Sequence, residues 1–101
     1  MMKLLLPKTI IATRENDPRM LVECLDQGAD VDARGPFGET ALHWAAMLGR
    51  ETMAELLLEK GANPSTVDYS GRTPMEFARS CRKHRVGVVL DKWHDDKQRQ
   101  R

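Results

Sequence analysis

The stretch GETALHWAA, residues 38–46, decides how the chain folds. A hydroxyl such as that of Thr40 can accept a hydrogen bond from an early helical N–H, which suits an N-cap. Ala45 and Ala46 are small enough to let another helix approach closely. Residues 39–48 are therefore predicted to form a short helix that packs tightly against another helix.

Several residues of this stretch recur at a fixed spacing of 33 positions. The related pairs are Gly38 and Gly71, Thr40 and Thr73, Ala45 and Ala78, Gly28 and Gly61, Ala29 and Ala62, and Met20 and Met53. Glycines and alanines at fixed places in a unit of this length are hard to obtain by chance. A period in this range indicates a protein built from stacked repeats.

The repeat unit is predicted to contain two helices and a loop. Gly49 ends the first helix, and residues 51–60 carry apolar side chains at helical spacing with glutamates on the opposite face. Gly61 occupies the place of a left-handed C′ residue, and Pro64 prevents further helix. Residues 65–71, STVDYSG, then suit an extended segment closed by a polar turn. The unit is therefore helix, tight turn, helix and hairpin-like loop.

The segment GETALHWAAMLGRETMAELLLEKGAN, residues 38–63, resembles the ankyrin repeat. That family usually shows G-x-T-P-L-H-x-A-A around its first helix and L-L-L-x-x-G-A-D or G-A-N after its second. The matching residues are Gly38, Thr40, Leu42, His43, Ala45, Ala46, Gly49, Leu56, Leu57, Leu58, Gly61, Ala62 and Asn63. Ala41 replaces the usual proline. The resemblance implies an all-α solenoid of helix-turn-helix units with β-hairpin-like loops.

The flanking units are degenerate copies of the central one. Glu23 stands where a leucine is expected, Arg82 replaces the glycine between the helices, and Gly87 is predicted to interrupt the last helix. Terminal units of a stack face water on one side, so such departures are typical of capping repeats. The predicted units span residues 4–36, 37–69 and 70–93, in one domain over residues 1–93 that is followed by a polar tail at 94–101.

Composition indicates an ordinary globular protein. Hydrophobic residues make up 41% of the chain and charged residues 31%, and 16 basic residues nearly cancel 15 acidic ones. The apolar run near the start stops at Pro7, too early for a signal peptide, and no segment has membrane-spanning length. Cys24 and Cys81 suit free thiols in a reducing compartment. We expect a soluble cytoplasmic protein with no membrane contact. If the basic run at residues 79–85 acts in nuclear import, the protein would also be found in the nucleus.

No arrangement of residues points to catalysis. Cys81 and His84 lie three apart across a predicted turn without a third orienting group, and His94 belongs to the polar tail. Glycine-rich phosphate loops, serine elbows and paired metal-ligand motifs do not occur. The prediction is therefore a protein that is not an enzyme, with no catalytic residue, no metal site and no cofactor.

The resemblance also assigns roles to the remaining residues of the motif. His43 is expected to hydrogen-bond backbone between neighbouring units, whereas Trp44 is left free by the motif. Partners of ankyrin-type proteins usually meet the hairpin tips and the exposed side of the first helices. The partner-binding residues carried over by position are Arg34, Pro36, Phe37, Trp44, Met47, Val67, Tyr69, Ser70, Phe77 and Ser80.

Aromatic residues stand out in this set. Exposed aromatics near Met and Arg are frequent anchors of protein interfaces. The alternative is that Trp44 and Phe77 pack within the stack without touching a partner. Phe37 and Tyr69 favour binding more strongly, because a hairpin tip offers little core to pack into.

A basic run, RSCRKHR, covers residues 79–85, whereas residues 15–32 carry six acids and one base. This run suggests a nuclear-import patch, a phosphate-binding patch or a site for an acidic partner; the simpler interpretation is a solvated end cap. Nucleic acid is the weaker interpretation, because the run lacks a motif that reads bases.

Three functional hypotheses follow. The leading one is a non-catalytic module that binds another protein through its concave groove and hairpin tips, as an adaptor or an occluding inhibitor. The alternatives are a structural subunit that docks end to end, and a basic C-terminal unit that binds nucleic acid or an anionic surface. Three units are about the minimum for a stable stack, so we expect a monomer that its partner stabilises.

Overall fold

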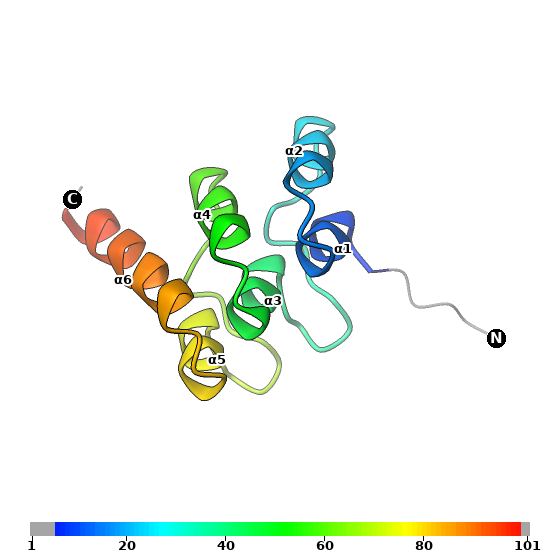
Figure 1. Cartoon of the computed structure of the whole chain (residues 1–101). Helices are drawn as coiled ribbons and strands as arrows, with labels where there is room; N and C mark the ends of the chain where they lie inside the picture. Colours follow the sequence, from blue (N-terminus) through cyan, green and yellow to red (C-terminus); the bar gives the residue numbers. More distant parts are fainter. Residues whose placement is uncertain (1–5, 100–101) are drawn as a thin grey trace.

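The computed structural model describes the backbone of residues 6–99 and the side chains of residues 6–93. Within this part the chain forms six helices and no strand. Their bounds are α1 Lys8–Arg14, α2 Pro18–Asp26, α3 Ala41–Leu48, α4 Glu51–Glu59, α5 Pro74–Ser80 and α6 His84–Arg99. Figure 1 shows them arranged as three consecutive helix pairs. This architecture confirms the predicted all-α solenoid.

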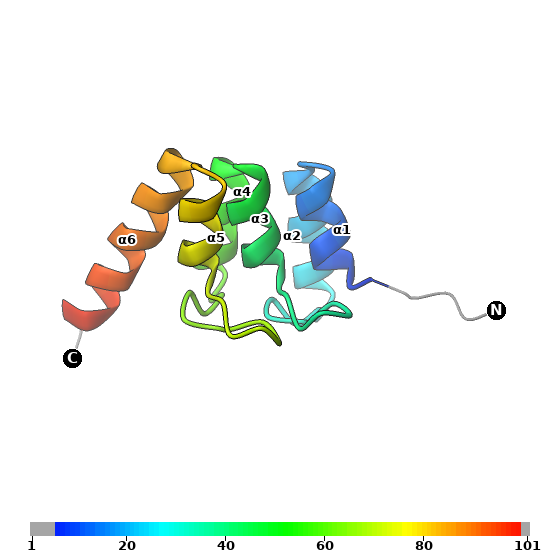
Figure 2. The same ribbon diagram turned by 90° about the horizontal axis from the view of Figure 1, so that it is seen from below.

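The helix pairs stack in chain order and form two layers. α3 contacts both α1 and α5, and α4 contacts both α2 and α6. The first helices of the pairs therefore line one layer and the second helices the other, while the long loops project from the same edge of the stack (Figure 2). The central pair α3–α4 has a neighbour on each side, whereas each outer pair has one among residues 6–99.

Local sequence explains the bounds of the central helices. The Thr40 hydroxyl accepts a hydrogen bond from the His43 N–H at 3.4 Å, as predicted for an N-cap. Gly49 ends α3 with φ at 71°, and Gly61 follows α4 with φ at 98°. Both lie in the left-handed region that glycine adopts without steric cost. The loop before α5 is hairpin-like without being a strand pair, since the Asp68 N–H donates to the Arg72 carbonyl at 2.9 Å.

The turns between paired helices differ in their chemistry. Asn16 and Arg82 occupy the places that correspond to Gly49, and both have positive φ, 56° and 58°. Arg82 thus takes over the backbone role of the glycine it replaces. For most residues other than glycine this conformation costs about 1–2 kcal/mol, and asparagine tolerates it better than arginine. The C-terminal repeat therefore contains a strained turn that the central repeat avoids.

The predicted interruption at Gly87 is wrong. α6 runs unbroken over 16 residues, and its backbone continues through most of the segment expected to be a polar tail. A glycine in a helix interior costs only about 1 kcal/mol relative to alanine. Val86, Val89 and Leu90, which are 1%, 5% and 2% exposed, hold this part of the helix against the stack. Tertiary packing therefore outweighs the local preference of Gly87.

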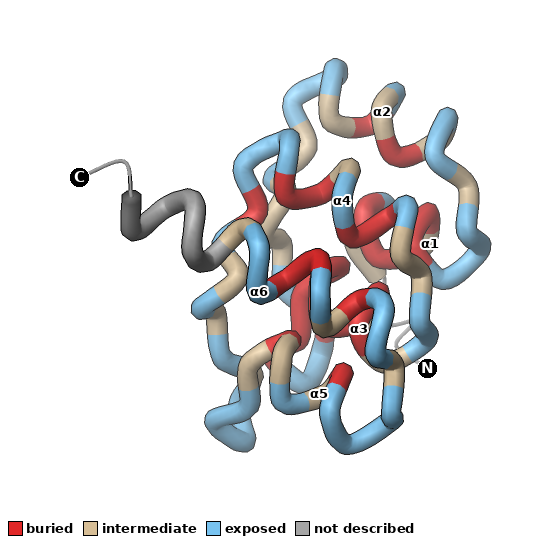
Figure 3. The backbone as a smooth tube through the Cα atoms, turned by 60° about the vertical axis from the view of Figure 1, so that its left-hand side comes forward, coloured by how far each residue is buried: buried red, intermediate tan, exposed pale blue. Residues whose placement is uncertain are grey.

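The hydrophobic core lies between the two helix layers. Its fully buried large side chains include Ile10, Leu21, Leu42, Met53 and Leu57. Figure 3 shows buried segments along α1, α3 and α4, while the loops are mainly exposed. Leu57 is 0% exposed and lies in this core.

Candidate functional site

The loops before α3 and α5 lie side by side, and each presents an aromatic side chain. Phe37 is 74% exposed and Tyr69 is 75% exposed. The Tyr69 N–H donates to the Phe37 carbonyl at 3.0 Å, so the two tips are joined through backbone. Arg34 donates through Nη1 to the carbonyls of Gly38 and Val67, each at 2.7 Å. These bonds hold the two loops, and the backbone of both aromatic residues, in a fixed relation.

Gly38 allows the Tyr69 ring to lie directly on the first loop. Its φ is 77°, and a Cβ atom at this position would collide with the Tyr69 ring. Glycine at position 38 therefore serves both the turn and the close approach of the aromatic ring. The exposed Tyr69 ring therefore packs against the backbone of the preceding repeat at Gly38.

Trp44 is half-buried and held by two contacts. Its Nε1–H donates to Glu39 Oε2 at 3.2 Å, and the Arg14 guanidinium lies 5.0 Å from the ring centroid. Glu39 is only 6% exposed and also accepts from the Phe37 N–H at 2.9 Å. The Glu39 carboxylate thus connects the loop tip to the first residues of α3.

Phe77 is also half-buried at the corresponding position of α5. The His43 and Phe77 rings form a T-shaped pair with centroids 5.6 Å apart, and the Arg72 guanidinium lies 5.8 Å from the Phe77 centroid. Both helix aromatics therefore pack within the stack while keeping part of their surface accessible. Each also has a guanidinium group at its face, a geometry typical of cation–π contact.

The other predicted partner-binding residues fall into two groups. Pro36, Val67 and Ser70 lie with Arg34 on the exposed loop tips. Met47 lies near the C-terminal end of α3, and Ser80 is the last residue of α5. Both are therefore at the helix ends far from the loop tips, and Met47 is half-buried. The structure thus brings the loop residues into one surface, which does not extend to Met47 or Ser80 at the far ends of those helices.

Sequence reasoning missed Glu39 and Arg72, which organise this surface. Both occupy the middle position of a G-x-T segment, which the repeat motif does not specify. A polar residue at such a position ordinarily faces solvent. Their contacts to Trp44 and Phe77 depend on the folded arrangement of the loops. No local sequence signal identifies them.

His43 has the architectural role that the resemblance implied. Its Nδ1 accepts from the Thr40 N–H at 3.0 Å, which leaves Nε2 as the protonated nitrogen that donates to the Arg72 carbonyl at 2.8 Å. Burial lowers the pKa of His43, because a charged imidazolium would lose its water. The neutral ring therefore connects α3 to the loop of the next repeat.

Asp68 organises the second loop. The Arg72 N–H donates to its Oδ1 at 2.9 Å, and the Ser70 hydroxyl donates at 2.7 Å. The backbone hydrogen bond from Arg72 and the bond from Ser70 lower the pKa of Asp68. An ionised Asp68 therefore shapes the turn that carries Tyr69.

Other chemistry is sparse in the described part of the chain. Residues 6–93 contain no group of three or more His, Cys, Asp and Glu side chains that could hold a metal ion. None of the described helices combines the length and apolar character needed to cross a membrane. Cys24 is buried, and burial raises the pKa of its thiol, whereas Cys81 is exposed in the turn after α5.

Comparison with known proteins gives a consistent result. A family model described as ankyrin repeats in three copies matches residues 9–98. Ankyrin repeat protein R664 of Acanthamoeba polyphaga mimivirus is 37% identical over 70 residues, which are 69% of this chain and 43% of that protein. The chain also matches potassium channel AKT1 of Oryza sativa, at 43% identity over 67% of this chain and 7% of the channel.

A third relative is the human ARF GTPase-activating protein GIT1, 45% identical over 53 residues. This match covers 52% of the present chain and 7% of GIT1. The chain therefore spans less than half the length of the viral relative that it matches and a small part of the channel and of GIT1.

Proposed function

Because the chain belongs to the ankyrin-repeat family, we propose that it binds a protein partner through the loop tips and the adjacent face of α3 and α5. Ankyrin repeats are generally interaction modules and not catalysts. The module acts as an adaptor where the partner's functional surface stays free, and as an inhibitor where the module covers that surface.

The observation that carries this proposal is the exposed pair Phe37 and Tyr69. Both are about three-quarters exposed although each could bury a large apolar surface. Burying one such side chain against a partner contributes roughly 1.5–3 kcal/mol. The bonds from Arg34 and Tyr69 hold the loops before a partner arrives, which reduces the entropy cost of binding.

The relatives support a modular role. The rice potassium channel and human GIT1 each share a segment with this chain that makes up a small part of their length. A repeat segment that recurs inside proteins with such different names is consistent with a portable binding unit. What those proteins do as wholes is not carried over to this chain.

The test is an affinity capture from cell lysate with the wild-type protein and the Phe37→Ala, Tyr69→Ala double variant. Because both rings are mostly exposed, this variant should fold normally, as circular dichroism would verify. Trp44 is a poorer choice, since its removal would leave Oε2 of the buried Glu39 without the bond from the indole. Leu48→Ala is the matched control, because Leu48 is an apolar side chain, 37% exposed, at the far end of α3.

The expected result is a protein retained by the wild type and by Leu48→Ala and lost with the double variant. If the folded double variant retains the same proteins as the wild type, the aromatic loop surface is not the binding site.

A further inference from the structure

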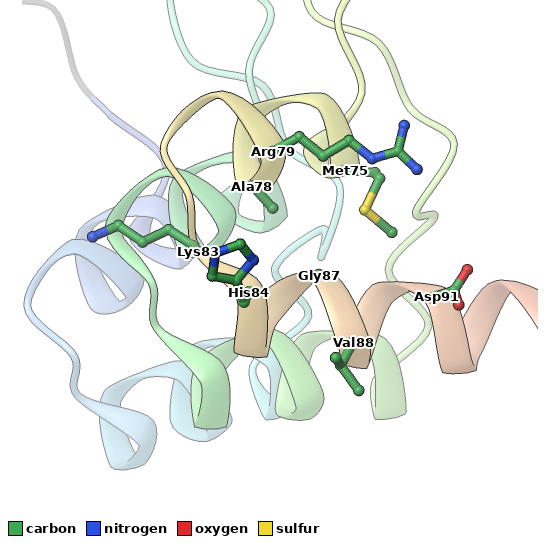
Figure 4. Close-up of a pocket in the computed structure, with 8 residues that line it drawn as sticks. All are labelled: Met75, Ala78, Arg79, Lys83, His84, Gly87, Val88 and Asp91. Atoms are coloured by element: carbon green, nitrogen blue, oxygen red, sulfur yellow. The ribbon is translucent and has the colours of Figure 1, made fainter.

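A groove lies on the C-terminal end of the stack, between α5 and α6. It consists of a hollow of about 330 Å³ and a second of about 230 Å³ that share Met75, Arg79 and Asp91. Figure 4 shows Met75 and Arg79 on α5 across from Gly87 and Asp91 on α6, with the Val88 side chain on the side of α6 that faces away from α5 in this view. We call this feature, lined by Met75, Arg79, Lys83, Gly87, Val88 and Asp91, the end groove.

The central repeat reveals what the end groove is shaped to hold. Counting back 33 residues, Met75, Arg79, Gly87 and Asp91 correspond to Leu42, Ala46, Ala54 and Leu58, which are at most 2% exposed. Those four are buried on a helix pair that has the next repeat, α5–α6, packed against it. The same backbone positions one repeat later form an open surface. The end groove therefore has the geometry of a face on which helices pack.

Charge distinguishes the end groove from its counterpart. Arg79 and Asp91 stand where the central repeat has Ala46 and Leu58. An apolar repeat packed here would strip water from both charges, which is costly. Among the described residues no ion pair joins them. The end groove therefore discourages an ordinary fourth repeat and requires an occupant that carries charge.

The charge that is missing is negative. Arg79 lines both hollows and Lys83 lines the first, and Asp91 is the one acid of the groove. The Lys83 stem lies against Gly49, and its ammonium points away from Asp91 (Figure 4). Within residues 6–93 the structure shows a single ion pair, between Arg85 and Glu51 at 4.0 Å, so neither Arg79 nor Lys83 is neutralised within that part.

The floor of the groove is open and apolar. A Cβ atom on Gly87 would meet only the Met75 sulfur, at 3.9 Å, so the absence of a side chain at position 87 keeps the space free. Val88 at its edge is 69% exposed. The space over Gly87 and Met75 fits a helix with small apolar residues on one face. The polar face of such a helix would lie toward Arg79 and Lys83.

We propose that the end groove binds an acidic amphipathic helix of another protein. Its apolar face covers Met75, Gly87 and Val88, and its carboxylates pair with Arg79 and Lys83. This assigns a role to the basic run at residues 79–85 that differs from the role of the loop surface. Two copies that met symmetrically through this face would bring like charges together, so such a pairing is a less suitable occupant.

The probe is a synthetic capped helical peptide of about 18 residues, or five turns, with alanine and leucine on one face and glutamate on the other. A matched peptide with lysine in place of glutamate is the ligand control. Binding is followed by amide shifts of the isotopically labelled full-length protein, which locate the contact. We expect shifts in α5 and α6 with the acidic peptide, weakening as salt rises.

Two variants address the two halves of the proposal. Gly87→Leu fills the floor and favours helix, so it should fold and weaken binding at least about tenfold. Arg79→Glu reverses the groove charge and should weaken binding by a similar factor, about tenfold. Arg19→Glu, an exposed charge reversal in α2 at the other end of the stack, should bind as the wild type. Circular dichroism verifies the fold of all three.

Several results would overturn the proposal. One is equal binding of the lysine peptide, and another is a set of shifts confined to the loops before α3 and α5. Equal or tighter binding of a single-stranded DNA oligonucleotide at α5 and α6 would assign the groove to nucleic acid instead. Self-association through these helices, seen by sedimentation, would assign it to a second copy.

Discussion

The central and C-terminal repeats have the same backbone plan but opposite end faces. In the central repeat, Leu42 and Leu58 lie on a face that the next repeat buries. In the C-terminal repeat, Met75 and Asp91 occupy the same positions and line an open groove. The comparison teaches that a few side chains, and not the course of the helices, decide whether a face continues the stack or ends it.

The same pair of repeats differs in how the first helix is capped. Thr40 and His43 form a capping box, and Thr73 and Glu76 form the equivalent one. His43 also reaches the Arg72 carbonyl of the next repeat, whereas Glu76 bonds only within its own turn. One motif thus both caps a helix and joins two repeats, and its copy only caps.

Core truncation should give the largest difference between the two repeats. Leu57→Ala should lower the free energy of unfolding by roughly 2–5 kcal/mol, because the side chain is fully buried between repeats. Leu90→Ala, the equivalent change in α6, should lie toward the lower end of that range, since α6 has a neighbour on one side only. Urea denaturation followed by circular dichroism measures both. Equal losses would contradict the idea that the central repeat is the better supported one.

Acidification should weaken the link that only the central repeat has. Because burial lowers the pKa of His43 in the fold, the unfolded chain binds the proton more readily. The stabilisation is fully present above the ordinary histidine pKa of about 6.5 and is lost as pH falls toward the folded pKa, by up to about 1.4 kcal/mol per pH unit. The free energy of unfolding, measured by urea denaturation between pH 5 and pH 7.5 at about half-unit steps, should show this slope.

The His43→Gln variant isolates this effect. Its unfolding free energy should vary less over the same pH range, whereas His84→Gln, a change at an exposed histidine, should keep the wild-type slope. An unchanged slope in His43→Gln would place the pH dependence elsewhere.

The turns between helices should respond in opposite directions. Gly49→Ala should destabilise by about 1–2 kcal/mol, because residue 49 has positive φ. Arg82→Gly should stabilise by up to about 1 kcal/mol, since it relieves the same strain but adds freedom to the unfolded chain. Thermal and urea unfolding of the two variants measure both effects. A loss of stability in Arg82→Gly would mean that the arginine side chain contributes more than its backbone strain costs.

The smallest effect on stability should come from converting one end face into the other. Arg79→Ala with Asp91→Leu restores the residue types of the central repeat, and exposed substitutions of this kind usually change stability by about 0.5 kcal/mol or less. The gain in apolar surface should instead cause concentration-dependent association, visible by sedimentation equilibrium. A double variant that stays monomeric at high concentration would show that these two charges do not terminate the stack.

Much of the fold can be predicted from the sequence, because the residues that specify it act on the backbone close to them. Thr40, Gly49 and Gly61 specify helix ends within a few residues of themselves, and the spacing of 33 specifies the stack. The prediction that Gly87 interrupts the last helix is wrong because the helix-breaking preference of glycine, about 1 kcal/mol, is smaller than the packing energy of its neighbours.

The site was less predictable than the fold. The loop aromatics Phe37 and Tyr69 were identifiable as residues that the scaffold leaves free. The buried position of Glu39 and the reach of Arg34 to Val67 depend on contacts between repeats. The end groove, likewise, depends on how α5 and α6 pack together. Such features follow from the assembled stack and not from any short segment.

The bonds that join the loops also bear on the kinetics of folding. Arg34 reaches a residue 33 positions later and His43 one 29 positions later, so these contacts between repeats close only short stretches of chain. Chains dominated by such near-sequence contacts fold quickly, in about microseconds to milliseconds. We expect nucleation at the junction of the central and C-terminal repeats. The same hydrogen bonds that join the loop of Tyr69 to the preceding repeat would then be among the earliest to form as the chain folds.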